Sequence, residues 1–162
     1  MNKNVIAFFR VKPNPTKPHF YEVRIFDTKA AMVAHWHKRH ESGYFTDKST
    51  GSGVVREFEA IASSSEKLEQ WSDGRWRKTP WLGEVLFYKS FMGAGIVSHE
   101  MSHAGLYWLT RNKDTSKGFN LSRRDDEKLA EAVGELSRQF WVKWFKKFST
   151  GHVPRAKGKV RK

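Results

Sequence analysis

Residues 93–109 read GAGIVSHEMSHAGLYWL, an apolar stretch that carries His99, Glu100 and His103. Its apolar residues suit a helix, so we expect one over about residues 94–109. In a helix, side chains four residues apart lie one above the other on the same face. The spacing therefore predicts that the imidazoles of His99 and His103 are neighbours, with Glu100 beside the first of them.

This HExxH pattern has the residue types that a catalytic zinc site needs. Two imidazoles one turn apart can bind one Zn²⁺, each at about 2.0–2.1 Å. Zinc lowers the pKa of a bound water to about 7, and a nearby carboxylate can then take its proton. The pattern predicts His99 and His103 as zinc ligands and Glu100 as the catalytic base. The alternative is a buried, hydrogen-bonded histidine pair next to a surface glutamate.

A catalytic zinc site also needs a third protein ligand and an open fourth position. The next predicted helix offers Glu127, Glu131 and Glu135. On a helical wheel, Glu127 lies nearest the apolar boundary and Glu135 lies well out in solvent, while Ala130 and Gly134 would let the two helices approach closely. We therefore expect Glu127 to be the third ligand. Glu131 is the alternative ligand, or a carboxylate that orients a ligating histidine, or a solvated charge.

The chain resembles the zincin metallopeptidases, and within them the gluzincin type, in which the third ligand is a glutamate on the helix after HExxH. The segment DDEKLAEAVGEL, residues 125–136, looks like the second-helix signature of small zincin-like proteins of bacteria and phages. The resemblance covers about residues 84–140. It implies hydrolysis of a peptide bond, hence a protein or peptide substrate. Such enzymes often use a His or Tyr to stabilise the oxyanion, and Tyr107 and Tyr88 are candidates.

The rest of the chain predicts an α+β fold, with a small mixed or antiparallel sheet packed on helices. Alternating or β-rich runs predict strands, apolar periodicity after a capping residue predicts helices, and Gly, Ser and Thr predict loops. The expected strands are 5–12, 20–26, 54–63 and 84–91, and the expected helices are 29–40, 65–71, 94–109 and 123–148, with a turn-rich stretch at 72–83. We expect residues 1–150 to form a single zincin-like domain.

The chain has 162 residues, a formal charge of +13 and no cysteine. The lack of cysteine excludes disulfide scaffolds, thiolate metal sites and a cysteine nucleophile. No apolar run is long enough to span a membrane, and the first residues do not resemble a secretory signal, so we expect a soluble, cytoplasmic protein. Residues 151–162 carry five cations without apolar periodicity and are expected to form a disordered basic tail.

The charge leaves two other functions open. The basic surface and tail could bind nucleic acid, or the chain could be a catalytically silent zincin-like interaction protein of a phage or mobile element. Residues 71–81 mix tryptophans with cations, which we interpret as buried tryptophans flanked by surface charge. Residues 141–148 mix aromatic residues with lysines, as an interfacial membrane helix would, but their helical spacing favours docking on the core.

Overall fold

The computed structural model describes residues 4–40, 60–64, 67–70, 72, 74–111 and 122–148. Strands and helices are mixed along the chain, which confirms the α+β class. In chain order the elements are β1 (Val5–Val11), β2 (Phe20–Phe26), α1 (Lys29–His40), β3 (Ile61–Ser64), β4 (Leu68–Gln70), β5 (Trp76–Lys78), β6 (Trp81–Tyr88), the 3₁₀ turn η1 (Lys89–Phe91), α2 (Ala94–Thr110) and α3 (Arg123–Phe148).

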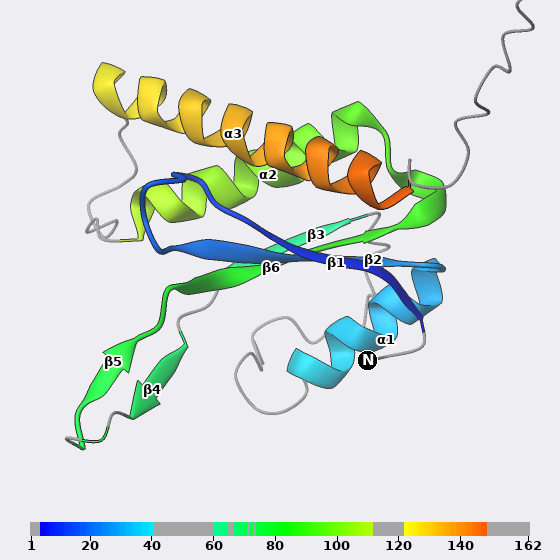
Figure 1. Ribbon diagram of the computed structural model, residues 1–162, viewed down its shortest axis with the longest axis horizontal. Coiled ribbons are helices and arrows are strands. Elements are labelled where there is room, and N and C mark those ends of the chain that lie inside the picture. The colour runs from blue at the N-terminus through cyan, green and yellow to red at the C-terminus, as the bar shows by residue number, and fades with distance from the viewer. Residues whose placement is uncertain are drawn as a thin grey trace, which may run out of the picture.

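Four strands form one mixed sheet in the order β1-β2-β6-β3. The pairs β1–β2 and β6–β3 are antiparallel, and β2–β6 is parallel. Gly83 permits the close approach of β6 to β3, because its φ is +145° and a Cβ there would lie 1.9 Å from the carbonyl oxygen of Ser63. Strands β4 and β5 form a separate hairpin that projects from one end of the sheet (Figure 1).

The sheet lies between two helical layers, with α2 and α3 on one face and α1 on the other (Figure 1). Since side chains alternate along a strand, each strand contributes to both faces. The larger core lies under α2 and α3; among its buried residues are Val23, Ile25, Val85, Phe87, Met101, Leu136 and Phe140. A smaller cluster under α1 contains Phe26, Met32, Ile61 and Leu86.

Helices α2 and α3 approach closely at Gly105. A Cβ on Gly105 would lie 3.0 Å from Cγ2 of Val133 and 3.2 Å from Cδ1 of Leu129. Gly134, in contrast, has nothing within 4 Å of its Cβ position, and Ala130 is exposed. The prediction that Ala130 and Gly134 line the helix contact is therefore wrong. The small residue at the contact is Gly105 of α2. Burial of Leu136 and Phe140 sets the rotation of α3 about its axis so that Ala130 and Gly134 do not line this contact.

Side chains of α3 cover the backbone of the edge strand β1 and the residue after it. The side-chain amide of Gln139 accepts a hydrogen bond from the Lys12 N–H at 3.0 Å and donates one to the Lys12 carbonyl at 3.1 Å. The ammonium group of Lys143 donates to the carbonyl of Arg10. Unpaired strand edges invite association with other chains, so these contacts protect the edge and fix α3 on the sheet.

Several predicted boundaries differ from the structure. The short helix expected at 65–71 is wrong, since Leu68–Gln70 is strand β4, and the turn-rich stretch 72–83 contains β5 and the start of β6. Strand β6 ends at Tyr88, and the 3₁₀ turn follows where strand was expected. Most of the expected strand 54–63 and the whole tail 151–162 lie outside the described residues. No helix within those described ranges is long and apolar enough to cross a membrane.

Candidate metal centre

Helix α2 presents His99 and His103 on its exposed side. Val97, Met101 and Ala104 are buried in the main core, and their burial fixes the rotation of the helix about its axis. The two histidines therefore face outward, as the i, i+4 spacing predicts. Their Nε2 atoms lie 3.2 Å apart, and the rings are almost perpendicular, at 85°.

This separation fits two ligands of one metal ion. Two nitrogen atoms that bind a tetrahedral zinc at 2.0–2.1 Å lie about 3.3–3.4 Å apart. The same nitrogen, Nε2, is turned toward the common point on both rings. The donor set also fits, since neutral imidazole is a usual ligand of zinc. The same 3.2 Å contact is also a hydrogen bond between the two rings, so the pair has both the spacing of two metal ligands and a contact of its own.

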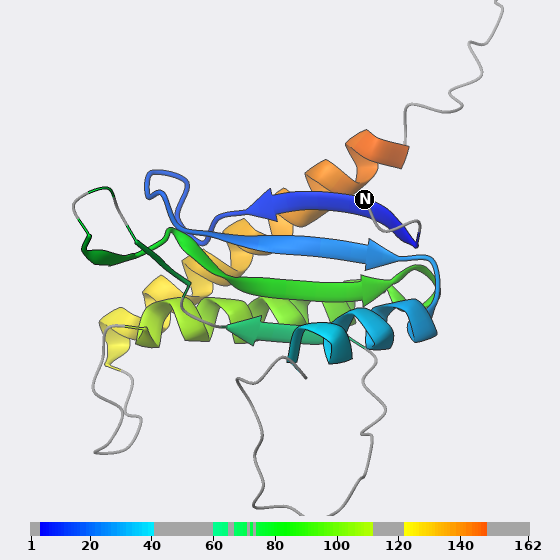
Figure 2. The ribbon, with the colours of Figure 1, turned by 90° about the horizontal axis from the view of Figure 1, so that it is seen from below.

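Glu100 lies beside the pair but points toward the sheet. It is 7% exposed, and its carboxylate accepts a hydrogen bond from the backbone of Ala62 in β3. Helix α2 runs along the edge of the sheet formed by this strand (Figure 2). Burial raises the pKa of Glu100, and the positive potential of His103 and His99 together with the Ala62 hydrogen bond counteracts part of that rise.

Tyr107 lies on the same exposed side, one turn after His103. The Tyr107 ring stacks on that of His103, with the centroids 6.4 Å apart and the planes at 27°. It is the only one of the two proposed oxyanion-stabilising tyrosines that the structure brings to the histidine pair.

Tyr88 lies on the opposite face of the sheet. Its neighbour Phe87 points into the main core under α2 and α3, so Tyr88 packs with Leu86 and Phe26 on the α1 side. Its ring stacks on Phe91, at 5.8 Å between centroids. The expectation that Tyr88 reaches the site is therefore wrong, because alternation along β6 turns it away.

The burial of the glutamates of α3 differs from what the helical wheel predicted. Glu127 and Glu131 are exposed, whereas Glu135 is partly buried and its carboxylate binds Arg138 at 2.7 and 2.8 Å and Gln139 at 2.7 Å. Over the described part of the chain, no group of three or more His, Asp or Glu side chains is placed to hold a metal ion. The structure thus brings His99 and His103 together, places Glu100 beside them but against the sheet, and does not add Glu127 or Glu131 to the pair.

Tyr21 is a residue that the sequence did not single out for the site. Its side chain is buried beneath α2, and its hydroxyl donates a hydrogen bond of 2.7 Å to the carbonyl of Ala104, next to His103. Burial raises the pKa of this phenol well above its usual range, so it remains a donor. Its inward position in the alternating strand β2, and the need of a buried tyrosine hydroxyl for a partner, are signals that could have identified it.

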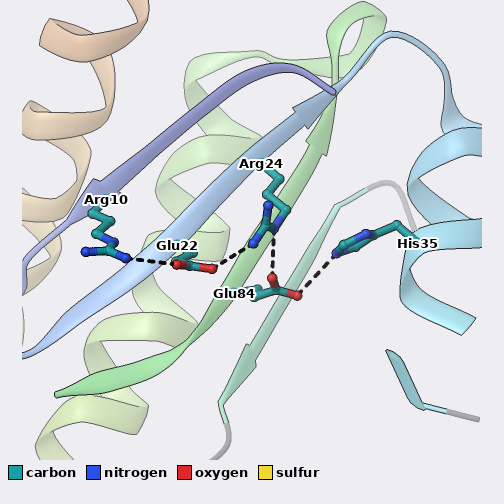
Figure 3. A network of polar contacts seen from close by, with 5 residues as sticks. All are labelled: Arg10, Glu22, Arg24, His35 and Glu84. Atoms are coloured by element: carbon teal, nitrogen blue, oxygen red, sulfur yellow. Dashed lines mark hydrogen bonds and ion pairs between the residues drawn. The ribbon is translucent and has the colours of Figure 1, made fainter. Parts of the chain in front are cut away.

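A second polar cluster lies on the α1 face of the sheet (Figure 3). The buried carboxylate of Glu84 binds Nε of Arg24 at 2.8 Å and lies 3.4 Å from Nε2 of His35. Arg24 also binds Glu22 at 2.7 Å, and Glu22 lies 3.4 Å from Arg10. The sheet separates this network from the histidine pair, since α1 and α2 lie on opposite faces.

No protein-family model, curated protein or solved structure matches this chain.

Proposed function

We propose that this chain is a zinc-dependent metallopeptidase of the zincin-like, gluzincin type, which hydrolyses a peptide bond in a protein or peptide substrate. The observation that carries the proposal is the 3.2 Å separation of the His99 and His103 Nε2 atoms. It matches the separation of two ligands on one tetrahedral ion, and it occurs next to a carboxylate of the HExxH pattern.

His99 and His103 would hold the zinc ion, with Glu127 as the third ligand and Glu131 as the alternative. Because no third side chain joins the pair among the described residues, the carboxylate of Glu127 has to move toward it when metal binds. Zinc, when bound, supplies Lewis-acid activation of water and of the peptide carbonyl.

Glu100 would act as the proton carrier. Its carboxylate takes a proton from the water that attacks the peptide carbonyl carbon, and returns it to the nitrogen of the leaving amine as the C–N bond breaks. Burial raises the pKa of Glu100 from its ordinary value, which favours this role because a base and acid works best with a pKa nearer the working pH. Tyr107, stacked on His103, is the candidate donor to the oxyanion.

The test combines metal analysis with peptide cleavage. The protein purified without chelators is expected to contain about one zinc per chain, and to cleave members of a mixed peptide library. Glu100→Gln should retain the metal and lose at least about a hundredfold in cleavage rate, since it keeps the shape of Glu100 without the base. His99→Ala and His103→Ala should lose the metal.

A protein that binds no zinc after purification and after zinc addition would contradict the proposal. A protein that binds zinc through His99 and His103 but cleaves nothing would contradict the peptidase and leave a catalytically silent zincin-like interaction module.

The exposed hairpin supports a second candidate function, nucleic-acid binding. Trp76 is 64% exposed, which contradicts its interpretation as a buried tryptophan, and β5 also carries Arg77 and Lys78. Exposed aromatic rings next to cations can stack on the bases of a single strand, and the formal charge of +13 favours a polyanion. A salt titration of single-stranded DNA binding tests this: an affinity that falls by about 10³-fold from 50 to 200 mM salt indicates several phosphate contacts.

A further inference from the structure

The last two turns of α3 expose apolar side chains to solvent. Val142 is 54% exposed, Phe145 is 56% exposed and Phe148 is 42% exposed. Trp141 and Trp144 lie on the same turns and pack partly against the main core. The expectation that this segment docks on the core is therefore correct for the two tryptophans, but it does not account for the three exposed residues.

The exposure follows from the length and direction of α3. The helix crosses the sheet diagonally, and its C-terminal turns extend past β1, the edge strand (Figure 2). The two tryptophans have the core on one side, while the residues on their other side have no strand beneath them among the described residues. Apolar side chains gathered on a protein surface can be a site of association.

The exposed side chains form one continuous surface with the tryptophans. The rings of Trp141 and Phe145 stack at 5.6 Å between centroids and 26° between planes. The rings of Trp144 and Phe148 lie 4.0 Å apart. Since both pairs have i, i+4 spacing, the aromatic rings run along one side of the helix. We call the surface of Trp141, Val142, Trp144, Phe145 and Phe148 the α3 aromatic patch.

Lysines share the last turns of α3 with this patch. Lys146 and Lys147 lie on the exposed last turn, and Lys143 lies one turn earlier, with its ammonium group on the edge of β1. The sequence then adds five more cations and no acidic residue over residues 149–162, namely Arg155, Lys157, Lys159, Arg161 and Lys162. Eight cations and five apolar side chains are thus concentrated at one end of the chain.

We propose that the α3 aromatic patch binds the surface of an anionic lipid bilayer, with Phe145, Phe148 and Val142 inserted at the level of the headgroups and the lysines on the phosphates. Aromatic residues on one side of a helix and lysines beside them are the features of an interfacial helix. A cluster of four to eight cations next to such a helix favours anionic lipids.

Two other occupants fit less well. A second copy of this chain would bring two sets of lysines together, namely Lys143, Lys146 and Lys147 of each copy, and their repulsion opposes such a dimer. A nucleic acid would satisfy the cations, but it would leave the aliphatic side chain of Val142 and much of the aromatic surface in water. A lipid surface satisfies both the charge and the apolar area.

The test is co-sedimentation of the full chain with vesicles of phosphatidylcholine alone, and of phosphatidylcholine with about 30 mol% phosphatidylserine. The protein should bind the anionic vesicles at about 0.1 M salt, and more weakly at higher salt, with at least about tenfold less binding to neutral vesicles. The double variant Phe145→Ser, Phe148→Ser should bind the anionic vesicles at least about tenfold less tightly. Since both side chains are exposed, the variant should keep the circular dichroism spectrum of the parent.

The matched control is Leu68→Ser, which removes an apolar side chain that is 50% exposed from strand β4 and should leave vesicle binding unchanged. The variant Lys146→Gln, Lys147→Gln should weaken binding to anionic vesicles at low salt. Failure to bind anionic vesicles overturns the proposal, as does equal binding by the parent and the Phe145, Phe148 variant. A dimer that Phe145→Ser dissolves, or a nucleic-acid complex that the same variant abolishes without any vesicle binding, overturns it as well.

Discussion

The Nε2 atoms of His99 and His103 lie 3.2 Å apart on the outward side of α2. Helical spacing brings the two residues together, and the burial of Val97, Met101 and Ala104 turns their side outward. Glu100, between them in sequence, is held against β3 instead. One helical turn therefore carries two exposed imidazoles and a buried carboxylate, which differ in their access to solvent.

Substitutions on α3 test the proposal that one of its glutamates is the third zinc ligand. We expect Glu127→Gln to lower zinc affinity by at least about a hundredfold, and Glu131→Gln to lower it by about tenfold if its carboxylate orients a histidine. Competition with a chromogenic chelator measures both affinities. Glu135→Gln is the control with no expected effect, because its carboxylate is bound by Arg138 and Gln139. A larger effect of Glu131→Gln would transfer the assignment to that residue.

The contact of α2 with α3 predicts opposite effects of one substitution at two glycines. Gly105→Leu should destabilise the protein by about 1–3 kcal/mol, because its side chain would overlap Val133 and Leu129. Gly134→Leu should stabilise it by about 0.5–1 kcal/mol, since the space there is open and leucine favours a helix more than glycine does. Urea unfolding measures both changes. Equal effects at the two positions would contradict the close approach at Gly105.

The network under α1 predicts unequal roles for two arginines. Arg24→Met should cost about 3 kcal/mol, because it leaves the Glu84 carboxylate, whose side chain is 3% exposed, without its arginine. Arg10→Met should cost less than about 1 kcal/mol, since Arg10 is 58% exposed and 3.4 Å from Glu22. Thermal or urea unfolding measures the loss of stability in each variant.

A double variant separates charge from packing in the same network. If the cost of Arg24→Met comes from removing the arginine's charge beside the Glu84 carboxylate, adding Glu84→Gln should recover part of it, and the two changes should be non-additive. Strict additivity would show that Arg24 acts through its packing over the Phe8 ring, 4.6 Å away.

Glu135 predicts a pH dependence of stability. Its hydrogen bonds to Arg138, followed by that to Gln139, hold the pKa of the carboxyl below its ordinary value of 4.5. Since the folded state binds this proton less tightly than the unfolded state, the stabilisation is complete above about pH 4.5 and is lost as the pH falls through the folded pKa. The stability difference between the parent and Glu135→Gln should therefore be constant near neutral pH and shrink below about pH 4.5. A difference that does not change with pH would contradict the role of these hydrogen bonds.

Local patterns in the sequence predicted several elements with the bounds that the structure has. Strand β2, helix α1 and helix α3 begin and end at the expected residues. Two of them carry local capping signals. The Thr28 hydroxyl accepts from the Ala31 N–H at 3.2 Å, and the Ser122 hydroxyl donates to Asp125 at 2.8 Å.

The β4–β5 hairpin was missed because no face of it is buried. All six of its strand residues are exposed, so the alternation that identifies a half-buried strand has no cause here. The hairpin is instead defined by its cross-strand pairs, such as Glu69 with Arg77, which a single segment of sequence does not reveal. The same absence of a packed partner explains the exposure of Trp76.

The sequence by itself determined the adjacency of His99 and His103, because a helix brings i and i+4 together whatever surrounds it. Only the tertiary structure decided which side of α2 faces outward, that Tyr88 lies across the sheet, and that Glu135 rather than Glu127 is the more buried glutamate of α3. These outcomes depend on which apolar side chains from distant segments pack together. Burial of Met101, Leu136 and Phe140 in one core fixes which side of α2 and of α3 faces the sheet. That orientation depends on contacts between segments far apart in the chain.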